Sequence, residues 1–123
     1  LLQKTVEYSK TRKQFGTVIG TFQALQHRMA DMFIECQLAR SIVVMAAMKL
    51  DSSADQREKT KAVSAAKSRV GKAIRRVSQE AVQIHGGIGV TNELDVGHYF
   101  KRATALEIMF GNTDYHVERF ASL

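Results

Sequence analysis

The sequence predicts an all-α fold, an up-and-down four-helix bundle, on three observations. The 123 residues contain no proline, which would break helix interiors, and they are rich in Ala, Met, Lys, Gln and Arg. Apolar residues recur at alternating steps of three and four along two long segments. Glycine-containing breaks separate these segments from shorter helical ones. A chain of this length is expected to form one domain with a substantial core.

The first two helices follow from this spacing. The chain opens within a helix that ends near residue 12, and a loop is expected over residues 15–20. A long amphipathic helix is predicted from Thr21 to about Leu50. Its apolar stripe consists of Phe22, Leu25, Met29, Phe33, Cys36, Ala39, Val43, Ala47 and Leu50.

A third helix is predicted after the break at residues 51–54. Ser53 and Gln56 fit a capping box at its start, and the glycine pair Gly86 and Gly87 fits its end. Two long helices joined by a short loop pack antiparallel, so the core is expected between them. The predicted core consists of Phe22, Leu25, Met29, Phe33, Val63, Val70, Ile74, Val77 and Ile84.

Two shorter helices complete the predicted bundle. One is expected over residues 95–101, and Asn112 is expected to cap a last helix that ends near Phe120. Leu1 and the residues after it already have the character of a helix interior, so we expect residues 1–123 to be one domain cut from a longer chain.

Composition argues against several functional classes. The net charge is +6, but the basic residues are scattered, without zinc-finger spacing, a helix-turn-helix signal or an aromatic-rich platform, so no nucleic acid partner is predicted. The four histidines show no metal-ligand spacing among themselves or with Cys36. No apolar run reaches the roughly 18 residues of a membrane span. A single cysteine and no signal peptide indicate a cytoplasmic protein, or a mitochondrial matrix protein in a eukaryote.

The break between the first two helices carries candidate binding residues. Arg12, Gln14, Phe15 and Gln23 place a guanidinium, two amides and an aromatic ring near one loop. An Arg fork suits a phosphate, and Phe15 could cover an aromatic ring of a ligand. An ordinary interhelical loop with a core Phe and a surface Arg explains the same residues, and spacing alone favours that simpler explanation.

The break after the third helix is more informative. The segment 83–91 places three glycines directly after a helix end. A helix C-terminus needs one glycine, and further glycines let a ligand approach the backbone closely. A glycine-rich turn without a ligand accounts for the segment equally well.

Taken together, these segments resemble the C-terminal helical domain of the acyl-CoA dehydrogenase family. The segment from Arg12 to Gln23 is similar to the family's Arg-x-x-Phe-Gly…Gln motif, and residues 30–32 are similar to its Ala-(Asp/Glu)-Met run. The segment from Gln83 to Gly89 matches its Gln-(Ile/Val)-x-Gly-Gly-x-Gly signature, and residues 100–103 stand where it has an Arg-Asp-Ala turn. The resemblance covers essentially the whole chain.

The resemblance implies an FAD-dependent enzyme that desaturates an acyl-CoA thioester between its α and β carbons. It implies a homo-oligomer, or a hetero-oligomer with a related subunit, in which the bundle contacts the FAD of its neighbour. An electron-transfer flavoprotein is the implied electron acceptor. The cofactor-binding residues that it implies are Arg12, Gln14, Phe15, Gln23, Gln83, Ile84, His85, Gly86, Gly87 and Thr113.

The family's usual catalytic carboxylate is missing from the matching segment before the last helix. The alignment places Gly111 or Phe110 at that position, and neither can accept a proton. The nearby acids Glu107 and Asp114 are displaced by several residues, so no catalytic residue is assigned to this chain. The resemblance leaves two sources for the base, an earlier helix that precedes Leu1 or a partner subunit, and the sequence alone leads us to prefer the earlier helix.

Two alternatives to a dehydrogenase remain open at this stage. An acyl-CoA oxidase-like relative would share the bundle and pass electrons to oxygen. A non-catalytic helical bundle, acting as an interaction module, would use the same apolar stripes.

Overall fold

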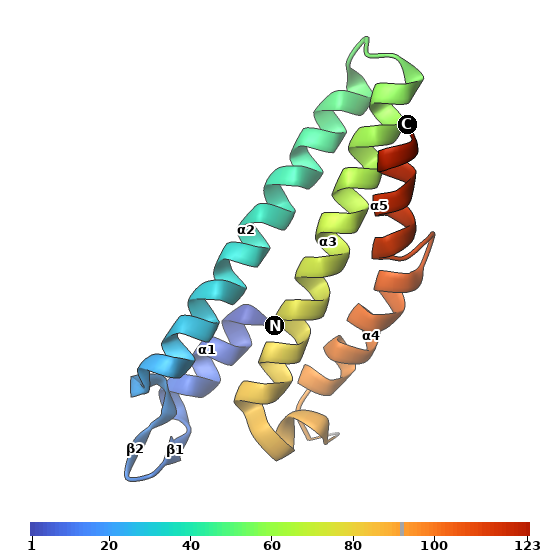
Figure 1. The fold of residues 1–123 in the computed structure, drawn as a ribbon. Helices are drawn as coiled ribbons and strands as arrows, with labels where there is room; N and C mark the ends of the chain where they lie inside the picture. Colours follow the sequence, from blue (N-terminus) through green and yellow to red (C-terminus); the bar gives the residue numbers. More distant parts are fainter. Residues whose placement is uncertain (92) are drawn as a thin grey trace.

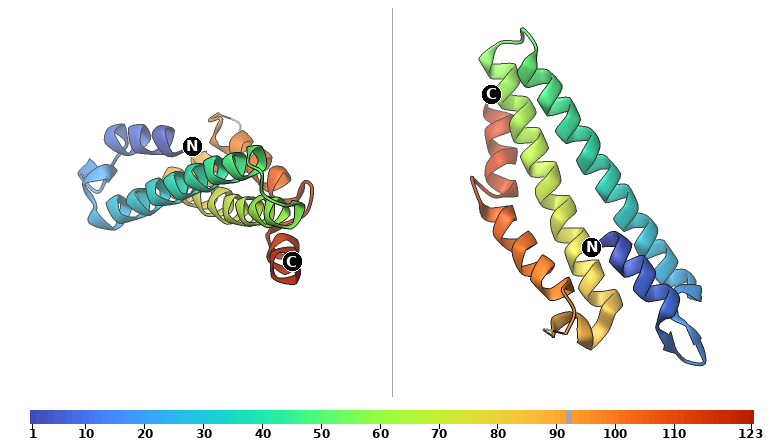
Figure 2. Two further views of the ribbon diagram at one scale, coloured as in Figure 1. Left: turned by 90° about the horizontal axis from the view of Figure 1, so that it is seen from above. Right: turned by 180° about the vertical axis from the view of Figure 1, so that it is seen from behind.

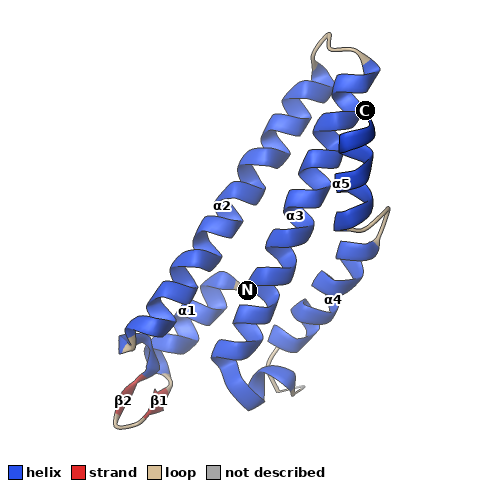
Figure 3. Cartoon of the chain, in the orientation of Figure 1, coloured by secondary structure: helices blue, strands red, loops and turns tan. Residues whose placement is uncertain are grey.

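The computed structural model describes residues 1–91 and 93–123, and most of them are helical (Figure 1, Figure 3). The predicted all-α bundle is confirmed. The elements in order are α1 (Leu2–Thr11), β1 (Lys13–Gln14), β2 (Thr17–Val18), the 3-10 turn η1 (Ile19–Thr21), α2 (Gln23–Asp51), α3 (Gln56–His85), the 3-10 turn η2 (Gly86–Val90), α4 (Val96–Ile108) and α5 (Thr113–Ser122).

The helix α3 lies at the centre of the bundle and contacts each of the other four α-helices. The long helices α2 and α3 run antiparallel, and α1 lies along the lower part of this pair (Figure 2). On another side of α3, α4 and α5 follow one another and form a fourth rod that is broken in the middle (Figure 1). The predicted four-helix architecture is therefore confirmed, except that two short helices, α4 and α5, take the place of one long fourth helix.

Small residues allow α3 to be surrounded in this way. Its buried positions include Ala62, Ser64, Gly71, Ala73, Ser78 and Ala81. At Gly71 a Cβ atom would collide with the Oγ1 atom of Thr113 at the start of α5. Because side chains this short let neighbouring backbones approach, α3 can contact helices on several sides.

The core is smaller than the sequence predicted. Val77 and Ile84 of α3 are buried as expected, together with Met32 of α2, and Phe22, Leu25 and Met29 pack against them. However, 53% of Phe33 and 37% of Val63 are exposed, and Val70 and Ile74 line an open groove beside α2. The prediction for these four residues was wrong for two reasons. Apolar residues occupy several faces of α2, and Phe33 lies on a face that is not packed against α3. Val63, Val70 and Ile74 of α3 line grooves beside α2 that neighbouring side chains leave open.

Helix ends agree with the sequence at two places and differ at two. Asn112 caps α5 by accepting the backbone N–H of Tyr115 at 2.9 Å, as predicted. Gly86 ends α3 with a φ of 67°, again as predicted. The predicted capping box of Ser53 was wrong, because Asp55 is the N-cap of α3 and accepts the N–H of Glu58 at 2.8 Å. The helix expected over 95–101 continues to Ile108, where a turn with positive φ angles follows.

The predicted loop over residues 15–20 is an ordered turn rather than an irregular connection. The strands β1 and β2 pair with Gln14 opposite Thr17, so that Phe15 and Gly16 form a two-residue hairpin turn. Within the described part of the chain, no helix is both long enough and apolar enough to cross a membrane.

Replacing Val77 with Asp tests the core. Val77 is buried between helices, so the variant buries an unpaired charge and should lose about 3 kcal/mol or more of unfolding free energy. Gln79→Asp, an exposed position on the same helix, should change it by less than about 0.5 kcal/mol. Urea unfolding followed by circular dichroism measures both. Equal losses in the two variants would contradict the assigned core.

Candidate functional site

A cavity of about 630 Å³ lies where α1 ends, α2 begins and α3 ends. Its wall combines residues from the two segments singled out in the sequence, which are about seventy positions apart. The lining residues are Tyr8, Arg12, Gln14, Phe15, Ile19, Phe22, Ala24, Leu25, Arg28, Gln83, Ile84, His85, Gly86, Gly87 and Ile88. The bundle therefore brings the two breaks together into one site.

Eight of the ten predicted site residues line this cavity, namely Arg12, Gln14, Phe15, Gln83, Ile84, His85, Gly86 and Gly87. Gln23 is the first residue of α2 and lies between two lining residues without lining the cavity itself. Thr113 lies elsewhere, buried at the start of α5 against α3. A cofactor contact by either residue stays a prediction.

The hairpin turn presents Phe15 in a strained conformation. Phe15 and Gly16 have φ angles of 55° and 80°, as a two-residue type I′ turn requires. A Phe residue at positive φ costs about 1 kcal/mol or more. Its ring is 89% exposed and meets the ring of Phe22 edge-on, with 6.1 Å between the centroids. The turn thus holds an aromatic ring at the cavity wall, where it gains little from burial within the domain.

The glycine segment forms another part of the wall. Gly86 has a φ of 67°, and a Cβ atom built at Gly86 or Gly87 would meet nothing within 4 Å. The space above this backbone is therefore open. Gly89, by contrast, is required for packing, since a Cβ atom there would lie 2.9 Å from the Cβ atom of His85.

The charged side chains that line the cavity are arginines. Its lining includes the guanidinium groups of Arg12 and Arg28 and no carboxylate. Arg28 pairs with Glu80 at 2.9 Å, while Arg12 has no ion pair among the described residues. The N-terminus of α2 also opens here, with Phe22 as an N-cap that provides no side-chain hydrogen bond. Unpaired N–H groups and the positive end of the helix dipole favour an anionic ligand.

Sequence reasoning missed Tyr8 and Arg28 as parts of this wall. Tyr8 lies one turn before Arg12 on α1, and its ring stacks on that of His85 with 4.3 Å between the centroids. Arg28 lies one turn into α2. Tyr8 is four residues before Arg12, so helical spacing could have identified it, whereas Arg28 is five residues after Gln23 and has no such signal.

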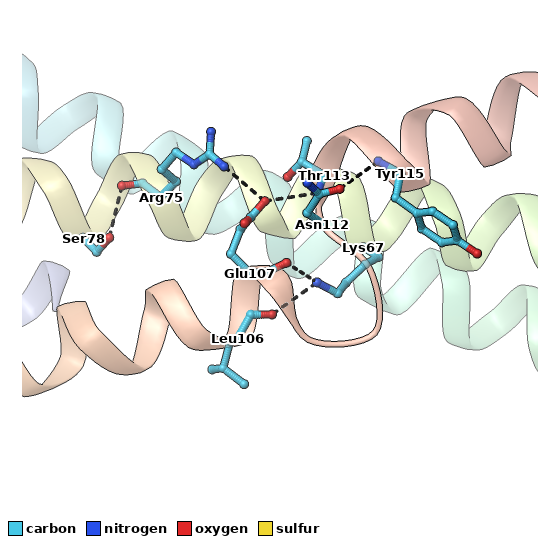
Figure 4. Close-up of polar contacts among 8 residues, drawn as sticks. All are labelled: Lys67, Arg75, Ser78, Leu106, Glu107, Asn112, Thr113 and Tyr115. Atoms are coloured by element: carbon cyan, nitrogen blue, oxygen red, sulfur yellow. Dashed lines mark hydrogen bonds and ion pairs between the residues drawn. The ribbon is translucent and has the colours of Figure 1, made fainter.

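The junction of α4 and α5 is a second polar cluster, shown in Figure 4. The buried carboxylate of Glu107 accepts the backbone N–H of Thr113 at 3.1 Å and pairs with Arg75 at 3.2 Å. The amino group of Lys67 donates to the backbone carbonyls of Leu106 and Glu107 at 3.2 and 2.8 Å. Side chains of α3 and α4 therefore provide hydrogen-bond partners for backbone groups at the end of α4 and at the start of α5.

The pKa of Glu107 lies below its ordinary value. The Thr113 N–H is the main cause, and the Arg75 guanidinium adds to it against the opposing effect of burial. Hydrogen bonds and positive charge favour the ionised carboxylate, which is consequently a weak proton acceptor. The geometry thus assigns Glu107 to the structure of the junction.

The turn between α4 and α5 is held in a fixed conformation. Phe110 and Gly111 have φ angles of 60° and 98°, and Phe110 is 89% exposed. The Nε2–H group of His116 donates to the carbonyl of Phe110 at 3.0 Å, and Nδ1 accepts from the hydroxyl of Ser64 at 3.4 Å. At Gly111 a Cβ atom would collide with the ring of Tyr115.

The described residues contain no group of three or more His, Cys, Asp or Glu side chains that could hold a metal ion. Cys36 is half-buried on α2, and burial raises the pKa of its thiol. A protonated thiol is a weak nucleophile, which agrees with its place on the apolar stripe.

Glu107→Ala should destabilise the fold by about 2 kcal/mol at pH 7, because it removes a charge-assisted bond to the end of α5. The pKa of Glu107 is lower in the folded than in the unfolded state. Its contribution to the unfolding free energy is therefore complete above the pKa of the unfolded state, and it is lost as the pH falls through the pKa of the folded state. The difference from the parent protein should therefore shrink below about pH 4. Denaturation at pH 7 and pH 3.5 measures it. Glu118→Ala, at an exposed position of α5, is the control, and a pH-independent loss in Glu107→Ala would contradict this role.

Comparisons with known proteins place these observations in a family. The family profile described as "Acyl-CoA dehydrogenase, C-terminal domain" matches residues 1–122. Acyl-CoA dehydrogenase IpdE2 of Mycolicibacterium smegmatis is 47% identical over 102 residues, which are 83% of this chain and 30% of that protein. The chain thus spans about 30% of the length of such relatives.

Solved structures agree with the sequence matches. The ChsE4–ChsE5 complex from Mycobacterium tuberculosis superimposes with a TM-score of 0.90 at 32% identity, over 98% of this chain and 32% of that one. The FAD complex of PigA superimposes with a TM-score of 0.88 at 27% identity, over 98% of this chain and 31% of that one. Sequence and fold therefore lead to the same conclusion, that the chain is a C-terminal domain of the acyl-CoA dehydrogenase family.

Proposed function

We propose that the cavity binds the diphosphate and adenosine part of FAD, and that the domain serves an acyl-CoA dehydrogenase that desaturates an acyl-CoA thioester. The observation that carries this proposal is that the two segments meet in one cavity, which is lined by two arginines and no carboxylate and has open glycine backbone in its wall. When bound, FAD supplies the acceptor for the hydride that leaves the β carbon of the substrate. The residues of this domain bind and orient the cofactor.

The donor set of the cavity fits a dinucleotide. The guanidinium of Arg12 and the open N-terminus of α2 suit a diphosphate. The exposed ring of Phe15 offers a face for stacking on adenine. Gln14 and Gln83 offer amide groups for polar atoms, and the open backbone at Gly86 and Gly87 lets the ligand approach closely. Gln23 and Thr113 are proposed to add contacts to the cofactor.

The domain is proposed to work inside an oligomer, homomeric or with a related subunit. Exposed apolar side chains along α2 support this, because large exposed apolar surface marks an interaction site. The exposed apolar residues of α2 are Phe33, Ile34, Leu38, Val43, Val44, Met45, Met48 and Leu50. The acyl-CoA substrate would be held mainly by parts of the protein outside residues 1–123. An electron-transfer flavoprotein is the proposed acceptor, in the bacterial cytoplasm or the mitochondrial matrix.

The catalytic base is proposed to come from outside the segment before α5. Phe110 and Gly111 carry no proton acceptor, and Glu107 is engaged by Thr113 and Arg75. Asp114 is exposed in the first turn of α5, several positions from the motif. We favour a partner subunit as the source, since a complex of two different chains, ChsE4 and ChsE5, is among the structures that match.

Arg12→Ala in the full-length protein should weaken FAD binding by about tenfold to a hundredfold, because a charge-assisted phosphate contact contributes about 1.5–3 kcal/mol. Gly86→Val should weaken it as well, by filling the open space over the backbone and by straining a residue at positive φ. Flavin fluorescence titration measures the dissociation constant. Lys13→Ala is the control, a neighbouring cation outside the cavity lining. Unchanged binding in both site variants would overturn the proposed site.

Expression of the full-length chain with and without its related subunit locates the base. FAD is loaded first, and acyl-CoA turnover is followed with an artificial electron acceptor. Turnover that requires the second subunit, and that disappears when one of its carboxylates is replaced, is the expected result. Turnover by the chain alone that is lost on replacing a Glu before Leu1 would place the base upstream. In either case Glu107→Gln and Asp114→Asn should remain active.

A further inference from the structure

Tyr8 contacts both halves of the cavity wall. Its backbone carbonyl accepts the N–H of Arg12 at 2.9 Å, the bond that closes the C-terminal end of α1. Its hydroxyl donates to the backbone carbonyl of His85 at 3.4 Å, and its ring stacks on the His85 ring at an interplanar angle of 28°. One residue of α1 thus joins the Arg12 segment to the glycine segment.

The surface against which Tyr8 lies is fixed. The His85 side chain is buried, with 5% of the residue exposed. Its Nδ1–H group donates to the carbonyl of Ala81 at 2.7 Å, one turn earlier on α3. His85 directly precedes Gly86, and Gly89 packs against its Cβ atom. A contact with His85 is therefore a contact with the rigid end of α3, from which the Gly86–Gly87 backbone starts.

The Arg12 side of the cavity has fewer constraints of its own. The helix α1 is ten residues long, and Arg12 follows its last turn. The carbonyl of Arg12 accepts the N–H of Ile19 at 2.8 Å, which fixes Arg12 to the hairpin segment but not to α3. The distance between Arg12 and the glycine backbone consequently depends on how α1 sits on α3, and Tyr8 lies at that contact.

We propose that Tyr8 is a positioning residue that sets the separation of Arg12 from the Gly86–Gly87 backbone and thereby matches the cavity to the diphosphate of its ligand. This inference rests on the proposed function, in which that ligand is FAD. The open Gly86–Gly87 backbone lets a diphosphate approach, and the Arg12 guanidinium must then lie within hydrogen-bond distance of it, about 2.7–3.2 Å, so displacement of α1 by about 1 Å weakens that contact. Tyr8 acts through Arg12 and needs no contact with the cofactor.

The test uses the full-length protein, with its partner subunit where one is required. Tyr8→Phe keeps the ring stacked on His85 and removes only the hydroxyl, so the protein should stay folded, with a melting temperature lowered by a few degrees at most. The dissociation constant for FAD should rise about threefold to tenfold, the range of one lost hydrogen bond. Tyr99→Phe, on α4 and away from the cavity, is the matched control and should leave both quantities unchanged.

A double-mutant cycle with Arg12→Ala distinguishes positioning from an independent contact. If Tyr8 acts through Arg12, adding Tyr8→Phe to Arg12→Ala should raise the dissociation constant by less than about twofold. Two results would overturn the inference, provided that Arg12→Ala itself weakens FAD binding. One is a double variant whose dissociation constant rises by the product of the two single effects. The other is a Tyr8→Phe variant with an unchanged dissociation constant. If Arg12→Ala and Gly86→Val both bind FAD normally, the proposed site itself fails, and this inference fails with it.

Discussion

The packing of α3 is the constraint on which the rest of the domain depends. A helix that touches four others has little room for large side chains, and α3 meets this condition with Gly71, Ala73, Ser78 and Ala81 at buried positions. Polar residues of α3 make further contacts with its neighbours. Arg69 reaches Glu35 of α2 at 2.6 Å, and Arg75 and Lys67 reach the junction of α4 and α5. One helix therefore organises both the core and the ends of its neighbours.

The cavity is a consequence of this arrangement. Because α3 fixes α1 on one side and receives α2 on another, the ends of the three helices meet at one place. Helix ends carry unpaired backbone groups, and here the glycines leave that backbone uncovered. The site thus consists of the parts of the bundle that helical hydrogen bonding leaves unsatisfied, supplemented by two arginines.

Much of the fold could be predicted from the sequence, because helix periodicity and caps are local properties. Asn112 and Gly86 marked helix ends correctly. Ser53 was predicted to cap α3, but the cap is Asp55, which lies two residues further on. Burial was harder to predict. Phe33 and Val63 belong to regular apolar stripes and are nevertheless exposed, since a stripe indicates which face is apolar but not which partner covers it. The hairpin was missed because Phe-Gly is an uncommon sequence for a type I′ turn.

The candidate site was predicted in a similar way. Motif segments identified Arg12, Phe15 and the glycines, which the fold brings together. Tyr8 and Arg28 could not be identified from a motif, because their place in the wall depends on how the helices pack against one another.

The hairpin turn at Phe15 has a consequence for protein engineering. Asn in place of Phe would relieve backbone strain of about 1 kcal/mol at this turn, since Asn tolerates the left-handed conformation. A directed-evolution campaign that selects only for heat resistance would therefore favour Phe15→Asn. The same substitution removes the exposed ring from the cavity wall. If such a campaign does not also select for ligand binding, it would enrich variants that are more stable to heat but bind the ligand more weakly.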